Sequence, residues 1–328
     1  RENYAIPRAL IKAGRNVNLI TDFWREGNSS DRCHPDLVNR NVKSFNLAFL
    51  CREFLARVTR KSSWRRMEDR NKWFSRKASR ALVDTANPGD IVFSYSYGAL
   101  EIFRQAKKMG CRTILGQIDP GPEEHKMVRE LQRKHGMLDA TEPAEQYWQR
   151  WTQECELADI IMVNSEWSRR NVIAAGVDAR KVVVVPLAYE ATFTSKVVSQ
   201  ERTLSECSPL KILFLGQLVV RKGIMETIEA ISVLQDKHIE WTFVGSGPEA
   251  VVTRLNEFSN VKVVGQVRHG EVENYYRSAD VFLLPTHSDG FGLTQLEALR
   301  YGVPMIVSSH CGDVVEHGRT GVILEAIT

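Results

Sequence analysis

Two acidic residues and two glycines lie close together in PTHSDGFGLTQLEALRYGVP, residues 285 to 304. Asp289 precedes Gly290 and Gly292, and Glu297 lies eight positions beyond Asp289. A glycine turn that opens a helix presents unpaired N–H groups and the positive end of the helix dipole, which favour phosphate. A carboxylate one turn into the helix can accept hydrogen bonds from a ribose diol. The spacing therefore predicts a nucleotide site, although ordinary turn chemistry explains the glycines alone.

A second turn carries the positive charge that such a site needs. GQLVVRKG, residues 216 to 223, follows the apolar strand KILFL and contains the adjacent cations Arg221 and Lys222. A cation at this place can neutralise a diphosphate as it leaves during group transfer. The alternative for an isolated Arg-Lys pair is a solvated surface turn.

Both turns need strands to hold them at one edge of a sheet. ADVFLLP, residues 279 to 285, is typical of a strand ended by proline. The helix after it is predicted at 293 to 301, with Thr294 as its cap and Gly302 as its stop. Strands and helices alternate along the rest of the chain, which predicts parallel sheets covered by helices.

The alternation predicts the α/β fold class, with two doubly wound domains at residues 1 to 200 and 206 to 328. Residues 196 to 209 lose periodicity and gain polar side chains, which predicts a linker. Residues 50 to 83 are typical of one long helical stretch. Ligands of such domains are expected at the carboxyl ends of the strands.

Composition is that of a soluble globular protein, with 43% hydrophobic and 26% charged residues. No apolar run approaches the roughly 18 residues of a membrane span, and no signal peptide is visible. Six cysteines without a CxxC pair favour a reducing compartment, so a cytoplasmic location is expected. Net charge is +9 over residues 1 to 205 and −5 over 206 to 328, so the first part is expected to meet an anionic partner.

The string from Asp289 to Glu297 resembles the acid-x7-acid signature of retaining nucleotide-sugar glycosyltransferases, most closely those of family 4, which have the GT-B fold. The resemblance covers most of the chain and is strongest from 210 to 324. It implies two Rossmann-like domains facing across a cleft, the first binding the acceptor and the second the donor. It also implies further elements at both ends, so the chain is expected to be truncated there.

The resemblance implies a role for each residue of the two turns. Lys222, with Arg221 or Gln217, would stabilise the departing diphosphate. Glu297 would bind the ribose, and Asp289 the sugar hydroxyls. Positions near the donor are implied at Gly216, Gly245, Gly290, Phe291, Gly292 and Leu293. The donor would be a UDP-sugar or a GDP-sugar, with no cofactor and no metal ion.

Three positions depart from the family pattern. Asp289 stands where the first acid is usually glutamate, and Gln217 stands where the G-R-x4-K-G turn has its arginine. The histidine that commonly contacts the donor sugar is replaced by Ile118 or Asp119. Asp119 either takes over polar contacts to the sugar or caps the helix that follows.

Two other kinds of site are disfavoured by missing partners. FVGSGPEA, residues 243 to 250, also fits the dinucleotide turn of oxidoreductases. That class needs an acid at the end of the next strand, but NVKVVG is followed by Gln266. His310 and Cys311 lack a third ligand at metal spacing, which disfavours a metal site or a nucleophile pair.

Residues 52 to 80 carry eleven Lys and Arg against three acidic residues, with four aromatic residues among them. Such a helical surface suits an anionic membrane or a phosphorylated acceptor, and would hold the protein peripherally at the inner membrane face. The alternative is a solvated helix whose aromatic side chains pack on the sheet. Nucleic acid is not an expected partner, because no RNP, KH or zinc-finger pattern is present.

The expected function is transfer of a hexose from a UDP- or GDP-sugar to a carbohydrate or glycolipid acceptor, with retention of configuration. Two alternatives stay open. One is a nucleotide-sugar binding module with little activity, because of Gln217 and the missing histidine. The other is a different GT-B enzyme, such as a sugar-nucleotide epimerase or a phosphorylase.

Overall fold

The computed structural model describes residues 4–24, 35–37, 41–58, 63–138, 142–189 and 208–327. The chain forms two compact units, which are treated separately below. Unit 1 is made of Arg1–Gly116 and Ala140–Ile161, and unit 2 of Gln117–Asp139 and Met162–Thr328. The linker expected at 196 to 209 lies almost wholly outside the described residues, and the domain boundary between 200 and 206 stays a prediction.

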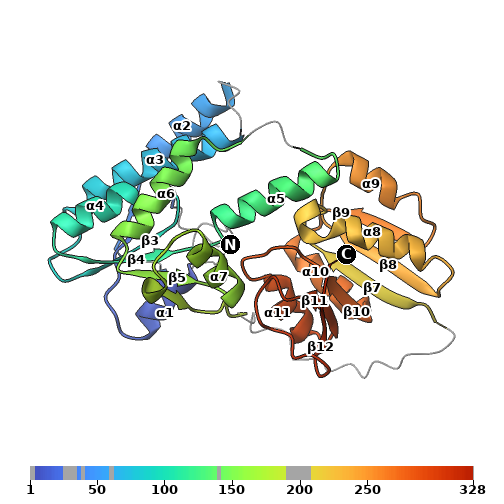
Figure 1. Cartoon of the computed structure of the whole chain (residues 1–328). Helices are drawn as coiled ribbons and strands as arrows, with labels where there is room; N and C mark the ends of the chain where they lie inside the picture. Colours follow the sequence, from blue (N-terminus) through green and yellow to red (C-terminus); the bar gives the residue numbers. More distant parts are fainter. Residues whose placement is uncertain are drawn as a thin grey trace. The chain divides into compact units, whose positions relative to one another are not determined.

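Unit 1 pairs short parallel strands with helices (Figure 1). Its elements are α1 (Ala5–Lys12), β1 (Leu19–Thr21), η1 (Pro35–Leu37), β2 (Val42–Ser44), α2 (Asn46–Val58), α3 (Ser63–Leu82), β3 (Ile91–Tyr95), α4 (Leu100–Lys108), β4 (Arg112–Gly116) and α6 (Glu145–Leu157). Strand β1 pairs with β2, and β3 pairs with β4 from Ile91 opposite Arg112. The larger sheet has the order β3-β4-β5-β6, in which β5 (Ile160–Val163) ends at the start of unit 2.

Unit 2 is built on one six-stranded sheet. Its elements are α5 (Pro122–Lys134), α7 (Glu166–Ala174), η2 (Ala179–Lys181), β6 (Val182–Val184), β7 (Leu210–Leu215), η3 (Val220–Lys222), α8 (Ile224–Val233), β8 (Ile239–Val244), α9 (Glu249–Leu255), β9 (Val261–Gly265), η4 (His269–Glu271), α10 (Val272–Ser278), β10 (Val281–Leu284), α11 (Leu293–Arg300), β11 (Met305–Ser308) and β12 (Gly321–Leu324). The sheet order is β12-β11-β10-β7-β8-β9. All of its strands pair in parallel, so the predicted α/β doubly wound architecture is confirmed here.

The apolar strands of this sheet are buried on both faces. Ile212 and Phe214 of β7 pack into a cluster with α8 and α9, whereas Leu213 packs into the cluster of α10 and α11. Alternate side chains of a strand point to opposite faces, so a strand covered on both sides is apolar at successive positions. This explains why KILFL shows no alternation of polar and apolar residues.

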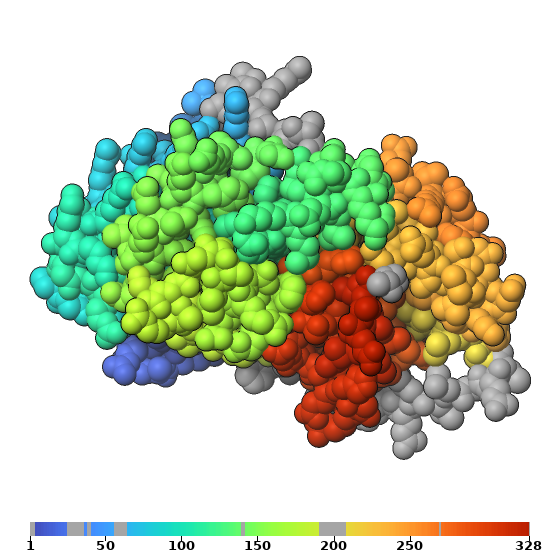
Figure 2. Space-filling view, viewed as in Figure 1, coloured from blue at the N-terminus to red at the C-terminus, as the bar shows by residue number. Residues whose placement is uncertain are grey.

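Helix α5 packs on unit 2, although it lies between strands of the first half of the sequence. Leu131 and Met137 contact the cluster formed by α8 and its strands. Figure 2 shows the green surface of α5 against the orange surface of this unit. A helical pattern indicates an apolar face but does not identify the sheet that the face will cover, so this placement was not predicted.

Two local expectations need correction, and one strand was not predicted. The single helical stretch expected at 50 to 83 is two helices, α2 and α3. The strand that was not predicted is β2. Helix α11 is capped by Gly292 in a left-handed conformation, so Thr294 lies inside the first turn and is not the cap.

No helix in the described ranges is long and apolar enough to cross a membrane.

Candidate functional site

The strand order of unit 2 places two loops at a switch point. Strand β7 lies between β8 and β10, and the chain runs outward from it in both directions. At such a point, the loops that follow the two neighbouring strands diverge, and open parallel sheets bind their ligands there. The loops after β7 and β10 hold residues 216–223 and 285–292, which are the two turns singled out in the sequence.

Glycines bring these loops into close backbone contact. Gly223 has φ 73°, and a Cβ placed on it would lie 2.0 Å from the carbonyl oxygen of Pro285. A Cβ on Gly245 would lie 1.8 Å from the carbonyl oxygen of Gly216. Only glycine fits at either contact, so Gly216, Gly223 and Gly245 fix the position of the loop that carries the cations. Gln217 is exposed on the same loop.

An ion pair joins the two turns. The ammonium of Lys222 contacts the carboxylate of Asp289, and the two side chains are 13% and 19% exposed. Arg221 extends toward other partners, because its Nη1 lies 3.6 Å from Glu124 Oε1 and donates to the backbone oxygen of Ser288. Both predicted cations therefore lie beside the loop that follows β10.

The turn at the start of α11, residues 290–293, presents backbone N–H groups. We call it the α11 turn. Gly292 has φ 76° and ends the turn as the N-cap of α11. Within the described chain, the N–H groups of Phe291, Gly292, Leu293 and Thr294 donate to no protein acceptor. Four free amides at the positive end of a helix suit an anion, and binding of phosphate there stays a prediction.

Side chains of the α11 turn point into the protein and not over these amides. Phe291 is 5% exposed, and a Cβ on Gly312 would lie 2.6 Å from its ring. The carbonyl oxygen of Gly290 accepts hydrogen bonds from Ser165 Oγ at 2.6 Å and Ser168 Oγ at 3.2 Å. In Figure 2 the yellow-green surface around α7, which begins after Ser165, adjoins the orange-red surface of the C-terminal part of unit 2.

Gln295 supports the turn from below. Its side chain is fully buried, and Nε2 donates to the carbonyl oxygens of Phe291 at 2.8 Å and Gly312 at 3.2 Å. The contacts of Gln295 with Gly312 and of Ser165 with Gly290 were not predicted, because each joins segments that are distant in the sequence.

Glu297 is held in place by a buried tyrosine. Its Oε2 accepts a hydrogen bond from Tyr276 Oη at 2.8 Å, and Tyr276 is fully buried in a stack on Tyr301. Burial and the Glu297 carboxylate both raise the pKa of Tyr276, so the phenol stays protonated and remains the donor. The second acid of the predicted pair is therefore fixed one turn into α11.

Asp119 makes the contacts of a helix-initiating turn. Its Oδ1 accepts hydrogen bonds from the backbone N–H of Gly121 and from Gln117 Nε2, both at 2.9 Å. These bonds form an Asx turn that precedes α5. The N-cap of α5 is Gly121, with no side-chain cap hydrogen bond, so the alternative that Asp119 caps this helix is wrong. Contact with a donor sugar stays a prediction.

Glu124 is a site residue that the sequence did not single out. It lies on the first turn of α5 beside Arg221, and burial raises its pKa, although Arg221 and a hydrogen bond from Ser288 oppose the shift. In the sequence, Glu124 is one of two acidic residues that follow Gly121 and Pro122. Acidic residues are common in the first turn of a helix, so this position gave no sign of a functional role.

A histidine pair links the loop after β10 to α8 and α5. Nε2 of His287 lies 2.9 Å from Glu226 Oε1, and Nε2 of His135 lies 3.9 Å from the same oxygen. Burial raises the pKa of Glu226, but the nearby imidazoles of His287 and His135 outweigh this effect, so the net pKa is lowered. The carboxylate therefore stays ionised and holds these elements together.

The Cys311 thiol is not poised for chemistry. It is 2% exposed, and burial raises its pKa to about 12, so it carries no thiolate near neutral pH. The neighbouring His310 ring stacks on Trp167 with centroids 4.3 Å apart. Burial also lowers the pKa of His310. Among the described residues, no group of three or more His, Cys, Asp and Glu side chains could hold a metal ion.

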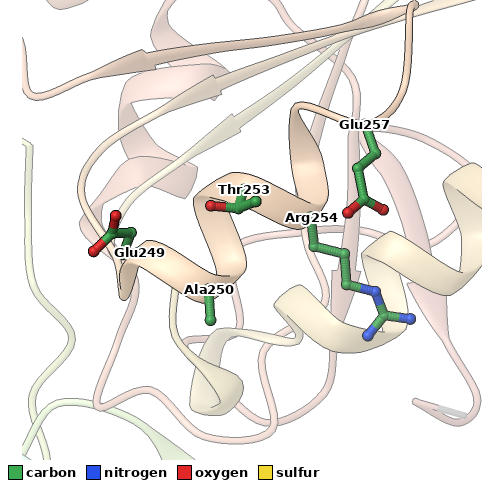
Figure 3. Close-up of a pocket in the computed structure, with 5 residues that line it drawn as sticks. All are labelled: Glu249, Ala250, Thr253, Arg254 and Glu257. Atoms are coloured by element: carbon green, nitrogen blue, oxygen red, sulfur yellow. The ribbon is translucent and has the colours of Figure 1, made fainter.

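A hollow elsewhere on unit 2 is unrelated to these loops. It is lined by Glu249, Ala250, Thr253, Arg254 and Glu257, all from α9 and the turn after it (Figure 3). Figure 3 shows the two glutamates at opposite ends of the helix, so the charged groups do not converge on one point. The hollow therefore lacks the arrangement expected of a small-molecule site.

Two family models match the chain. The model described as Glycosyltransferase Family 4 matches residues 4–192, which is more than half of the chain. The model described as Glycosyl transferases group 1 matches residues 209–327. The chain belongs to glycosyltransferase family 4. The assignment made from the acid-x7-acid string is thereby confirmed.

Curated relatives of this family 4 glycosyltransferase align with part of their length. An uncharacterized 41.2 kDa protein in the cps region of Klebsiella pneumoniae is 28% identical over 175 residues, covering 51% of this chain and 48% of that protein. The putative teichuronic acid biosynthesis glycosyltransferase TuaC of Bacillus subtilis is 40% identical over 102 residues, covering 31% of this chain and 24% of that protein. The chain thus spans about half of these relatives or less.

Solved structures share the fold of this family 4 glycosyltransferase. The lipopolysaccharide outer core galactosyltransferase WaaB superposes with a TM-score of 0.60 at 17% identity, covering 100% of this chain and 85% of that chain. HepE of Anabaena, solved in complex with UDP, gives 0.55 at 17% identity, covering 76% of this chain and 68% of that chain. At these identities the likeness concerns the fold, and it confirms the predicted GT-B architecture.

Proposed function

We propose that this family 4 glycosyltransferase transfers a hexose from a UDP- or GDP-linked donor to a saccharide or lipid-linked acceptor, with retention of anomeric configuration. The observation that carries the proposal is the contact of Lys222 with Asp289, the residue next to the amide-lined α11 turn, at the switch point of the sheet. Together they supply a cation and several N–H donors to the two phosphates of a diphosphate. The UDP in the HepE structure and the galactosyltransferase name of WaaB support this donor class.

In the proposed reaction, the bond between the anomeric carbon and the diphosphate breaks, and the acceptor hydroxyl bonds to the same face of that carbon. The acceptor proton passes to a phosphate oxygen of the leaving group. Lys222 exchanges its contact with Asp289 for the more highly charged diphosphate, and Asp289 is then free to accept hydrogen bonds from the sugar hydroxyls. Arg221 supplies the second positive charge that Gln217 cannot supply, and Glu297 binds the ribose.

The test compares Lys222→Ala with wild type for release of nucleoside diphosphate and for binding of UDP and GDP by calorimetry. We expect turnover to fall on the order of 10²–10³-fold, because a charge stabilising the leaving group is lost. Lys237→Ala is the matched control, because this lysine is exposed on the same unit, away from the turns. The melting temperatures of both variants should stay near that of wild type. Equal turnover in all three proteins would refute the role of Lys222.

A second candidate is a binding module without transfer. It is favoured by Gln217, which is exposed and places no charge at the position where relatives have arginine. Calorimetric binding of UDP or GDP without diphosphate release, over a panel of acceptors, would support it. Product analysis separates the remaining alternatives, since a phosphorylase consumes inorganic phosphate and an epimerase releases no diphosphate when it only inverts a sugar centre.

A further inference from the structure

Both cations of the candidate site are paired with carboxylates. Lys222 contacts Asp289 of the loop after β10, and Arg221 Nη1 lies 3.6 Å from Oε1 of Glu124 on α5. The side chains of Arg221 and Glu124 are 23% and 16% exposed. A diphosphate that uses both cations must therefore compete with two carboxylates. The outcome for each carboxylate depends on the partners that remain to it.

The two carboxylates differ in these remaining partners. In the proposed reaction, Asp289 accepts hydrogen bonds from the sugar hydroxyls. Oε1 of Glu124, in contrast, is buried and has no hydrogen-bond partner among the described residues. Its contact with Arg221 is longer than a hydrogen bond and is therefore weak. Arg221 stays anchored without Glu124, because its Nη1 donates to the backbone oxygen of Ser288 at 2.5 Å, and its other N–H groups can turn to a phosphate.

Glu124 keeps one hydrogen bond, which comes from the Ser288 hydroxyl. Ser288 is fully buried, and its Oγ accepts a hydrogen bond from Trp167 Nε1 at 2.9 Å. An indole N–H can only donate, so the hydroxyl proton of Ser288 is left for Glu124. One neutral donor is not enough to keep a buried carboxylate ionised when its cation pairs with another anion.

The charges around Glu124 act in opposite directions. Burial is the main reason that its pKa is raised, Asp119 and Asp289 add to this effect, and Arg221 opposes it. The positive end of α5 also favours the ionised form. A diphosphate brings further negative charge and takes over the guanidinium of Arg221. Both changes raise the pKa of Glu124 further, so both favour uptake of a proton.

Charged groups on the helices around Glu124 form pairs of their own. Helix α7 packs on α5, and α8 lies against it through the cluster that contains Leu131. The pairs are Glu166 with Arg169 on α7, Glu123 with Lys126 on α5, and Glu226 of α8 with His287 and His135. The charged groups that act most on Glu124 therefore come from the loops and not from these helices.

We propose that Glu124 is a displaceable counter-ion of Arg221, and that it takes up a proton from solvent when a nucleoside diphosphate or its sugar binds. The carboxylate becomes a neutral acid, so no uncompensated charge is left buried beside the ligand. This inference rests on the proposed donor site and adds a residue of α5 to it. Where the free protein holds Glu124 ionised, donor affinity should therefore rise as pH falls.

The test is calorimetry of the protein with UDP, GDP and pyrophosphate, in buffers of different ionisation enthalpy, which gives the number of protons taken up on binding. Above the ordinary glutamate pKa of 4.5, wild type should take up more protons than Glu124→Gln, by up to about one proton per ligand. The difference between the two proteins cancels the titration of the ligand itself. Glu123→Gln, which removes the same charge one position earlier on α5, is the matched control and should behave as wild type does.

Affinity separates this role from a purely structural one. Glu124→Gln removes a competing carboxylate, so at about pH 8 it should bind each ligand about three- to tenfold more tightly than wild type does. A glutamate that only holds Arg221 in place would give weaker binding in the same variant. Ser288→Ala removes the hydroxyl donor, which should raise the pKa of Glu124 and move proton uptake to higher pH.

Two outcomes would overturn the inference alone. One is equal proton uptake by wild type and Glu124→Gln, and the other is weaker binding by Glu124→Gln. Each is observed only if a diphosphate binds, so the donor site itself would stand. Failure of wild type to bind any of the three ligands would refute the donor site and this inference together. Melting temperatures near that of wild type should confirm that the variants are folded.

Discussion

The α11 turn and the exposed apolar side of helix α2 present different parts of the chain to their surroundings. In the α11 turn, Phe291 is buried and the Gly290 carbonyl is bound by two serines, so that backbone N–H groups face outward. In α2, the backbone groups are used within the helix, and the side chains of Leu47, Leu50 and Phe54 face outward.

This difference indicates what each surface can recognise. Backbone donors fixed by glycine and by buried contacts suit a small anion of defined geometry, because their positions do not depend on side-chain rotamers. A stripe of flexible apolar side chains suits contacts that depend on buried apolar area and not on the geometry of single polar groups. Binding at the α11 turn should therefore depend on the positions of individual backbone groups. Binding at the exposed side of α2 should depend on its total apolar area.

The sharpest contrast lies within α2 itself, between its inner and outer phenylalanines. Phe49→Ala should lower the free energy of unfolding by about 3 kcal/mol, because a buried ring is replaced by a cavity. Phe54→Ala should change it by no more than about 0.5 kcal/mol, because the ring is 70% exposed. Urea unfolding followed by circular dichroism measures both. Similar losses of unfolding free energy in the two variants would show that the Phe54 side of α2 is covered in the folded protein.

The two ends of α11 test whether backbone position in the turn matters for binding. Gly292→Ala and Gly302→Ala each place a side chain at a positive φ, 76° and 63°, which costs about 1–2 kcal/mol. Only at Gly292 would the Cβ also contact protein, 3.1 Å from Gln295 Nε2, whereas at Gly302 it meets nothing within 4 Å. We expect Gly292→Ala alone to weaken UDP or GDP binding, by about tenfold. Equal affinities in the two variants would argue against the α11 turn as the phosphate site.

The smallest expected effect concerns pH and the loop after β10. Because the pKa of Glu226 is lowered in the folded state, its pair with His287 stabilises the protein above the ordinary glutamate pKa. That stability is lost as pH falls through the lowered pKa. Glu226→Gln should therefore flatten the acid side of a plot of the free energy of unfolding against pH, by about 1 kcal/mol or less. Glu229→Gln, which alters an exposed carboxylate on the same helix, should leave the plot unchanged.

The sequence was sufficient to predict those features that depend on neighbouring residues. Successive apolar residues identified the strands of unit 2, and the glycines near Phe291 identified the turn, because both signals lie within a few positions. The cap of α11 was misassigned to Thr294, since threonine is a common cap and the left-handed φ of Gly292 leaves no mark in a sequence.

The rest depends on contacts between distant segments. Glu124 meets Arg221 across 97 positions of sequence, and Ser165 meets Gly290 across 125, so no local pattern could predict either pair. The outward orientation of Phe54 was equally hidden, because an apolar stripe on a helix normally indicates the buried side. The predicted roles of Asp289 and Glu297 toward a sugar and a ribose stay predictions.

The two serines that bind the Gly290 carbonyl restrict how hybrid proteins can be made. In a chimaera joined at residues 196 to 209, residues 209 to 327 would come from this chain. The positions of Ser165 and Ser168 would come from another protein. The Gly290 carbonyl would keep its partners only if the foreign segment supplied hydroxyls at both places. A graft that exchanges donor preference should therefore carry residues 162 to 175 together with the C-terminal half.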